Sequence, residues 1–141
     1  MKILMAVDGS PHSLQAVRHV LNLAAELRQP PELLLLNVQP NVATGNVKLF
    51  IDAGTIEDYE IERGMTALQG ARRMLDEAGL SYRYHLSVGA PAAAIVQFAQ
   101  AEQVALLVLG THGEGGIAKR LLGSVAQQVA EMAPMPVTFV R

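Results

Sequence analysis

The sequence has no cysteine and no tryptophan, and only 4% of its 141 residues are aromatic. A chain without cysteine forms no disulfide, no thiolate nucleophile and no cysteine-based zinc site, which is compatible with the cytoplasm. Basic tracts are also missing. The chain has 11 Lys and Arg and 13 Asp and Glu, for a formal charge of −2. Nucleic-acid binding depends on clustered basic side chains and on aromatic rings that stack with bases, so the composition argues against a nucleic-acid partner.

Long apolar runs are missing as well. A helix needs about 20 apolar residues to cross a bilayer, and no apolar run approaches this length, so no membrane partner is expected. Met1 and Lys2 lead directly into an apolar segment, which leaves no room for a signal peptide and favours a cytoplasmic location. The composition itself is globular, 50% hydrophobic and 17% charged, and the length is typical of one domain, which we expect to span residues 1–141.

Short apolar runs predict five strands, with capping and breaking residues marking helices between them. The strands are expected at residues 3–7, 33–38, 82–88, 104–109 and 137–140. Ser10 as N-cap and Pro11 at the first helical position predict the first helix. Residues 89–91 predict the start of a third helix that ends near Ala101, and a fourth helix is expected at residues 124–132.

A long second helix is expected after a loop at residues 40–54. Thr55 and Asp58 resemble a capping box at its start, and Gly79 is typical of its end. The residues expected along one face of this helix are Ile61, Met65, Leu68, Arg72 and Leu75.

Strands that alternate with helices predict an α/β fold with a parallel sheet covered on both faces. Right-handed connections favour a doubly wound sheet of five strands in the order 3-2-1-4-5. In that order the first and fourth strands are neighbours, and their helices leave to opposite faces. A crevice therefore opens at their carboxyl ends, where ligands of such folds bind, and it would lie between Asp8 and Gly110.

The most informative motif is Gly110-Thr111-His112-Gly113, followed after nine residues by Gly123-Ser124. Ser124 with Gln127 has the pattern of a capping box, so the order is strand, glycine-rich loop, capped helix. Glycines allow close approach of backbone N–H groups to a ligand, and a helix N-terminus adds unpaired N–H groups and a partial positive charge. This order predicts a phosphate cradle, in which His112 is either a hydrogen-bond donor to phosphate or an ordinary loop residue.

Two standard phosphate motifs fit less well. The Walker pattern G-x-x-x-x-G-K-[ST] does not occur. Residues 113–118 match the dinucleotide fingerprint G-x-G-x-x-[GA], but they lie late in the chain, and no acidic residue ends a strand about 20 residues further on. A dinucleotide-dependent oxidoreductase is therefore a weak alternative.

In these residues the chain resembles the universal stress protein family and its nucleotide-binding branch. The branch carries G-x-x-G, nine residues, then G-[ST], which matches Gly110, Gly113, Gly123 and Ser124. The resemblance runs through nearly the whole chain, from the first strand with Asp8 to residues 134–137.

The resemblance implies that the protein binds ATP or a related adenine nucleotide, ADP or AMP, usually with Mg²⁺. It implies that the backbone of Val38 reads the adenine edge, that Asp8 faces the ribose, and that the glycine loop holds the phosphates. The full set of implied contacts is Ala6, Val7, Asp8, Val38, Leu109, Gly110, Gly113, Gly123, Ser124 and Val125. It also implies a homodimer formed through the last strand, residues Val137–Val140.

One departure from the family pattern keeps a second function open. Glu114 stands where family members often have Arg or Lys, and a carboxylate near phosphates would repel them. The alternative is therefore a nucleotide-free dimeric interaction protein. Lys119 and Arg120 would either supply positive charge near the phosphates or be solvated. No activated nucleophile or acid–base pair is evident, so any ATP hydrolysis is expected to be slow or to depend on a partner.

Overall fold

The computed structural model describes residues 1–40, 53–113 and 121–141, and for residues 53–57 the backbone only. The predicted loop at 40–54 lies almost entirely outside the described residues, as do Glu114, Lys119 and Arg120. The elements follow each other as β1 (Lys2–Ala6), α1 (Pro11–Glu26), β2 (Glu32–Gln39), α2 (Ala53–Glu77), β3 (Tyr82–Val88), α3 (Pro91–Ala101), β4 (Leu106–Gly110), α4 (Ser124–Met132) and β5 (Val137–Val140).

The described strands form one parallel five-stranded sheet in the order β3-β2-β1-β4-β5, which confirms the predicted topology. Ala6 at the end of β1 is level with Leu36 of β2 on one side and with Leu109 of β4 on the other. The central strand therefore ends before both of its neighbours do, which opens the crevice at its carboxyl end.

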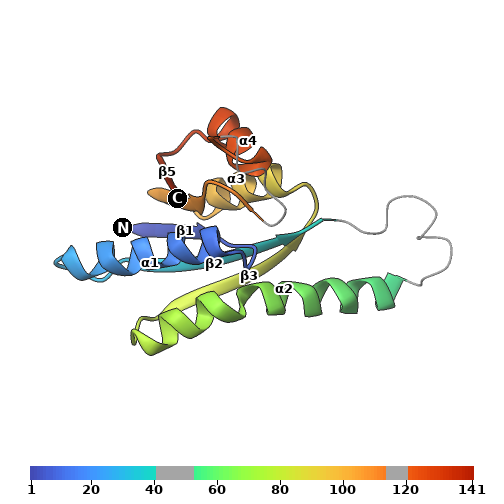
Figure 1. Ribbon diagram of the computed structural model, residues 1–141, viewed down its shortest axis with the longest axis horizontal. Helices are drawn as coiled ribbons and strands as arrows, with labels where there is room; N and C mark the ends of the chain where they lie inside the picture. Colours follow the sequence, from blue (N-terminus) through green and yellow to red (C-terminus); the bar gives the residue numbers. More distant parts are fainter. Residues whose placement is uncertain (41–52, 114–120) are drawn as a thin grey trace.

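Helices cover both faces of the sheet, α1 and α2 on one face and α3 and α4 on the other (Figure 1). Successive side chains of a strand point to opposite faces, so each strand contributes to two cores. Ile3 and Met5 of β1 pack with buried residues of α1 and α2, whereas Leu4 and Ala6 pack with those of α3 and α4. No helix in the described part of the chain is long and apolar enough to cross a membrane.

The start of α1 is built as predicted. Ser10 is the N-cap, its Oγ accepts a hydrogen bond from the Ser13 N–H at 3.3 Å, and Pro11 takes the first helical position. Pro11 supplies the fixed φ of a helix and lacks an N–H that would have no partner there. This cap sets the direction in which the chain leaves β1 beside the crevice.

The predicted range of the fourth helix, 124–132, matches α4, but the caps predicted for the second and fourth helices are wrong. Helix α2 begins at Ala53, so Thr55 lies inside it rather than at its cap. Helix α4 begins at Ser124, but its N-cap is Gly123, with no side-chain cap hydrogen bond. Ser124 is thus one position inside the helix, where its Oγ accepts from Gln128 Nε2 at 3.3 Å. A cap needs extended backbone, and it is Gly123, with ψ 172°, that has it.

The end of α2 follows the prediction, but one residue of its predicted buried face does not. Gly79 has φ +69° and its N–H bonds to Asp76, while the next N–H, of Leu80, bonds to Leu75. This paired arrangement is the Schellman motif, which favours glycine. Of the residues predicted to share a buried face, Leu68 and Leu75 are buried, whereas Ile61 is 46% exposed.

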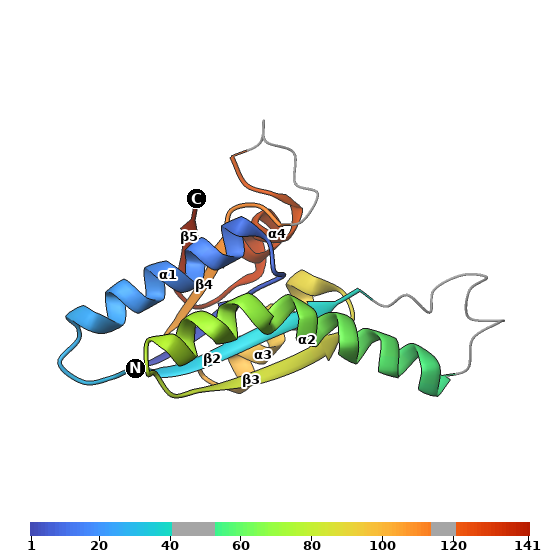
Figure 2. The same cartoon turned by 60° about the horizontal axis from the view of Figure 1, so that its bottom comes forward.

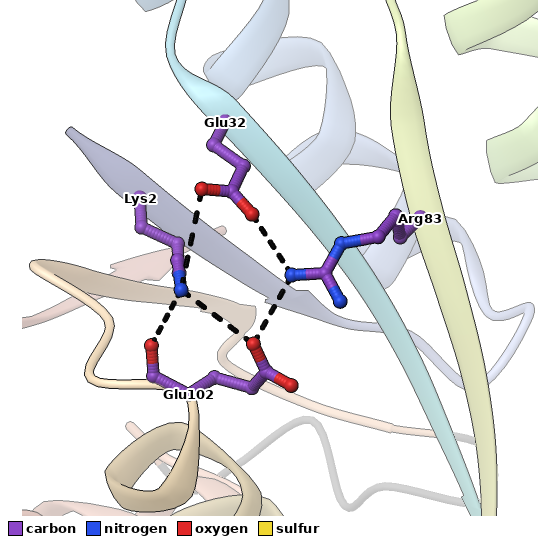
Figure 3. Close-up of polar contacts among 4 residues, drawn as sticks. All are labelled: Lys2, Glu32, Arg83 and Glu102. Atoms are coloured by element: carbon purple, nitrogen blue, oxygen red, sulfur yellow. Dashed lines mark hydrogen bonds and ion pairs between the residues drawn. The ribbon is translucent and has the colours of Figure 1, made fainter.

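A network of four charged residues lies at the amino ends of β1, β2 and β3 (Figure 3). Arg83 of β3 contacts Glu32 of β2 at 2.8 Å and Glu102, just after α3, at 3.1 Å. Lys2 of β1 contacts the same two carboxylates at 4.0 and 3.6 Å and donates to the Glu102 carbonyl at 2.8 Å. The network ties three neighbouring strands and the end of α3 together.

Candidate functional site

The crevice at the carboxyl ends of β1 and β4 contains a cavity of about 460 Å³, a volume in the range of small-molecule sites. It forms because α1 leaves β1 towards one face while α4 follows β4 on the other. The structure brings together all ten residues of the predicted contact set. Those that line the cavity are Ala6, Val7, Asp8, Val38, Leu109, Gly110, Gly113, Gly123, Ser124 and Val125.

One end of the cavity is apolar and lies beside the end of β2. Leu36 and Leu109 line it together with Pro91 and Ile95 of α3. The backbone of Val38 completes this wall, because hydrogen-bonding directions alternate along a strand. The Leu36 carbonyl accepts from Val7 N–H on the β1 side, so the N–H and C=O of Val38 point to the same side, where β1 has already ended. A flat ring here would meet apolar faces and a backbone donor and acceptor at its edge.

Two buried amides form hydrogen bonds where the ladder between β1 and β2 ends. Asn37 Nδ2 donates to the Val7 carbonyl at 2.9 Å, and Gln39 Nε2 donates to Asn37 Oδ1 at 2.8 Å. The side chain of Asn37 thus takes the Val7 carbonyl, which a continuing ladder would have paired with the Val38 N–H. Both amides line the cavity, and the sequence pattern gave neither a role in the site.

Asp8 connects the two halves of the crevice. Its Oδ1 accepts from the Ser10 N–H at 2.9 Å, so the carboxylate does stabilise the turn into α1. Its other oxygen lies against the glycine loop, because a Cβ on Gly113 would stand 2.5 Å from Oδ2. Any side chain at position 113 would therefore displace the Asp8 carboxylate from the cavity wall.

The other two loop glycines are required by the protein itself. A Cβ on Gly110 would lie 2.7 Å from the backbone carbon of His12, so β4 and the first turn of α1 touch at this point. A Cβ on Gly123 would lie 3.2 Å from the Thr111 carbonyl, which already accepts from the Gly123 N–H at 2.6 Å. These contacts give both glycines a packing role in addition to the predicted close approach to a ligand.

The far end of the cavity is formed by the loop after β4 and the first turn of α4. Gly123, Ser124 and Val125 bring the N-terminal N–H groups of α4 to this end. His112 lines it as well, with Nδ1 3.0 Å from Thr111 Oγ1 and its ring 5.3 Å from that of His12. Polar backbone and small side chains at this end contrast with the apolar wall near Val38.

Arg63 is a cavity residue that the sequence pattern did not select. It comes from α2, and its guanidinium carbon lies 5.7 Å from the centre of the Tyr59 ring. Nothing in the spacing of α2 distinguishes Arg63 from other charged residues on an exposed helix face. Only the packing of α2 beside β2 brings it to the crevice.

Comparison with known proteins assigns the family. The model of the universal stress protein family matches residues 1–141. The chain belongs to the universal stress protein family. A universal stress protein of Thermus aquaticus is 47% identical over 143 residues, covering 99% of this chain and 97% of that protein. Universal stress protein MJ0531 of Methanocaldococcus jannaschii is 35% identical over 144 residues, covering 99% and 81%. The resemblance seen in the sequence is thereby confirmed.

Solved structures agree with this assignment. The structure of MJ0577 superposes with a TM-score of 0.83 at 27% identity and covers 99% of this chain and 94% of its own. A universal stress protein solved in complex with cAMP superposes with a TM-score of 0.70 at 28% identity and covers 100% and 97%. The architecture of this universal stress protein is therefore that of its solved relatives.

Proposed function

We propose that this universal stress protein is a cytoplasmic homodimer that binds ATP or a related adenine nucleotide as a regulatory ligand. The observation that carries the proposal is the cavity of about 460 Å³ in which all ten predicted contact residues meet. Its apolar wall with the Val38 backbone suits a purine, and its other end, at the N-terminus of α4, suits phosphate. A relative with 28% identity was solved with cAMP, which is an adenine nucleotide.

The metal chemistry of the proposed site depends on the ligand. Among the described residues, no group of three or more His, Asp or Glu is placed to hold a metal ion. Asp8 is the one described carboxylate in the cavity wall. Mg²⁺ is usually held by one or two carboxylates, phosphate oxygens and water, so it would arrive bound to the nucleotide.

A charge placed at the phosphate end tests the proposal. Val125 lines the cavity and is 36% exposed, so Val125→Glu is expected to fold normally while placing a carboxylate beside the phosphates. Two like charges about 4 Å apart repel by about 1 kcal/mol in water and more near protein, so ATP affinity should fall about tenfold. Isothermal titration calorimetry with ATP measures the change.

Gln127→Glu is the matched control. Gln127 lies on the same helix, is exposed and does not line the cavity. The substitution introduces the same charge near the same helix N-terminus. Because this side chain lies outside the cavity, Gln127→Glu should leave ATP affinity unchanged. Equal affinities for all three proteins, or no binding of ATP to the unmodified protein, would contradict the proposed function and favour a nucleotide-free interaction protein.

A further inference from the structure

We infer that Arg63 of α2 is a ligand-binding residue of the crevice and pairs with the phosphate of the bound adenine nucleotide. The inference rests on the proposed function and adds a residue from outside the glycine loop. It makes the site three-sided, with walls from the strand ends, from the β4–α4 loop and from α2.

Arg63 stands where two cavities join. The nucleotide cavity shares Asp8, Gln39, Arg63 and Gly113 with a neighbouring cavity of about 800 Å³, which extends over the start of α1. A side chain that lines both lies at their common mouth. A ligand in the first cavity therefore has Arg63 within reach at the junction, where Asp8 and Gly113 also lie.

The position of α2 at this mouth is fixed by packing. The N-terminal part of α2 extends beyond the carboxyl ends of β2 and β3 (Figure 2). Gly9, with φ +85°, follows Asp8, and a Cβ on it would lie 3.3 Å from the backbone of Ala67. The turn that carries Asp8 thus rests directly on α2, one helical turn from Arg63, so Asp8 and Arg63 belong to one packed unit.

The side chain of Arg63 is directed along the helix by its neighbour. Its guanidinium carbon lies 5.7 Å from the centre of the Tyr59 ring, one turn earlier on α2. A cation–π contact of this kind limits the conformations of a long side chain and leaves its N–H groups available to a ligand. Guanidinium groups bind phosphate in a planar, bidentate geometry that lysine does not reproduce.

The charge of the cavity wall favours a cation at this position. Among the described residues that line the nucleotide cavity, Arg63 is the one with a permanent positive charge, and Asp8 is the one carboxylate. A nucleotide brings further negative charge to a wall that already contains Asp8. The Arg63 guanidinium offsets both, which predicts that it favours nucleotides over the uncharged nucleoside.

Three ligands and three variants test this role by calorimetry. Adenosine, AMP and ATP are titrated into the unmodified protein and into Arg63→Gln, Arg63→Lys and Arg73→Gln. Arg73 lies on the same helix, is exposed and does not line the cavity. Arg63→Gln should weaken AMP and ATP binding by roughly five- to tenfold and leave adenosine unchanged, because the lost bonds are charge-assisted contacts to phosphate. Arg63→Lys should recover part of the loss, and Arg73→Gln should behave like the unmodified protein.

The outcomes separate this inference from the proposed function. Unchanged AMP and ATP affinity in Arg63→Gln would overturn the role of Arg63 while leaving the nucleotide site in place. An equal loss for adenosine would overturn it too, since the residue would then act on the base or on the fold. If the unmodified protein bound none of the three ligands, the proposed function itself would fail. Thermal unfolding of each variant shows that it is folded at the titration temperature.

Discussion

At the scale of single residues, Gly110 is the described glycine whose added Cβ would come closest to backbone atoms. Its missing Cβ lets the end of β4 contact the backbone of His12 in the first turn of α1. Gly110→Ala would bring a carbon to 2.7 Å from that backbone, so the helix or the strand must move. Overpacking of this kind typically costs about 1–3 kcal/mol. Denaturant unfolding should show that loss.

Gly113→Ala is the comparison for Gly110→Ala. The atom that the new Cβ would meet is Asp8 Oδ2, at the end of a side chain. A side chain can rotate away more easily than backbone can move. The cost in stability of Gly113→Ala should therefore be clearly smaller than that of Gly110→Ala. Equal losses for the two variants would contradict the assignment of Gly110 to the packing of α1.

These glycines also show what the sequence reveals and what it leaves out. Their spacing identified the loop and its place at the crevice, because it is a local pattern. The reason for each glycine depends on what faces it across the fold, His12 for Gly110 and Asp8 for Gly113. Arg63 was not predicted as a cavity residue for the same reason, since only the packing of α2 against the Asp8–Gly9 turn brings it to the cavity.

At the scale of elements, strands and helices were predictable wherever an apolar run meets a residue that stops it. β3, α3 and β5 match the expected ranges, and the Gly79 end of α2 does as well. The errors concern helix caps, where Thr55 and Ser124 had the composition of caps without the position, and the fourth strand, which begins at Leu106 rather than at residue 104. Capping residues are also common inside the first turn of helices. Composition alone therefore predicts the first residue of a helix to no better than one or two positions.

The charge network at the amino ends of the strands predicts a specific sensitivity to acid. The hydrogen bond from Arg83 holds the pKa of Glu102 below its usual value. A depressed carboxylate pKa contributes stability that is present above the unfolded-state value of about 4.5 and is lost as pH falls through the lower folded value. Unfolding temperature should therefore drop in this acid range, by a few degrees at most, because the residues are partly solvated.

Glu102→Gln tests the source of that loss. The amide does not titrate, so the variant should be less stable at neutral pH and should lose less on acidification than the unmodified protein. Glu131→Gln, an exposed change on α4 outside the network, is the control. Thermal unfolding from pH 7 down to pH 3 measures all three. Parallel pH profiles for Glu102→Gln and the unmodified protein would show that the network does not contribute.

At the scale of the whole molecule, the sheet has two edges, and they differ. β3 carries the exposed residues Arg83, Tyr84 and His85, with the Arg72 guanidinium 4.5 Å from the centre of the Tyr84 ring. β5 is short and its four residues are all partly buried and mostly apolar. Charged and bulky polar side chains at an edge oppose pairing with another chain, whereas a short apolar edge favours it. This contrast supports β5, rather than β3, as the proposed dimer edge.

The backbone of β5 shows which groups a partner would meet. The carbonyls of residues 136 and 140 accept from β4, so Val137 and Phe139 direct their N–H and C=O groups away from it. Antiparallel pairing of two β5 strands about a two-fold axis would bond these groups in both copies. Val137→Pro removes one outward donor per chain, hence two per dimer, while the bonds to β4 remain. At about 1 kcal/mol for each hydrogen bond, the dimer dissociation constant should rise about tenfold or more.

Val137→Ala separates the loss of the donor from the loss of the side chain. It shortens the same side chain but keeps the N–H, so its dimer should be closer in strength to that of the unmodified protein. Sedimentation equilibrium over a range of concentrations gives the three constants, and circular dichroism shows that each variant keeps its sheet. A monomer at every concentration of unmodified protein would refute the dimer. A Val137→Pro dimer as tight as that of Val137→Ala would show that the chains associate through another surface, because an interface built on the β5 backbone depends on that N–H.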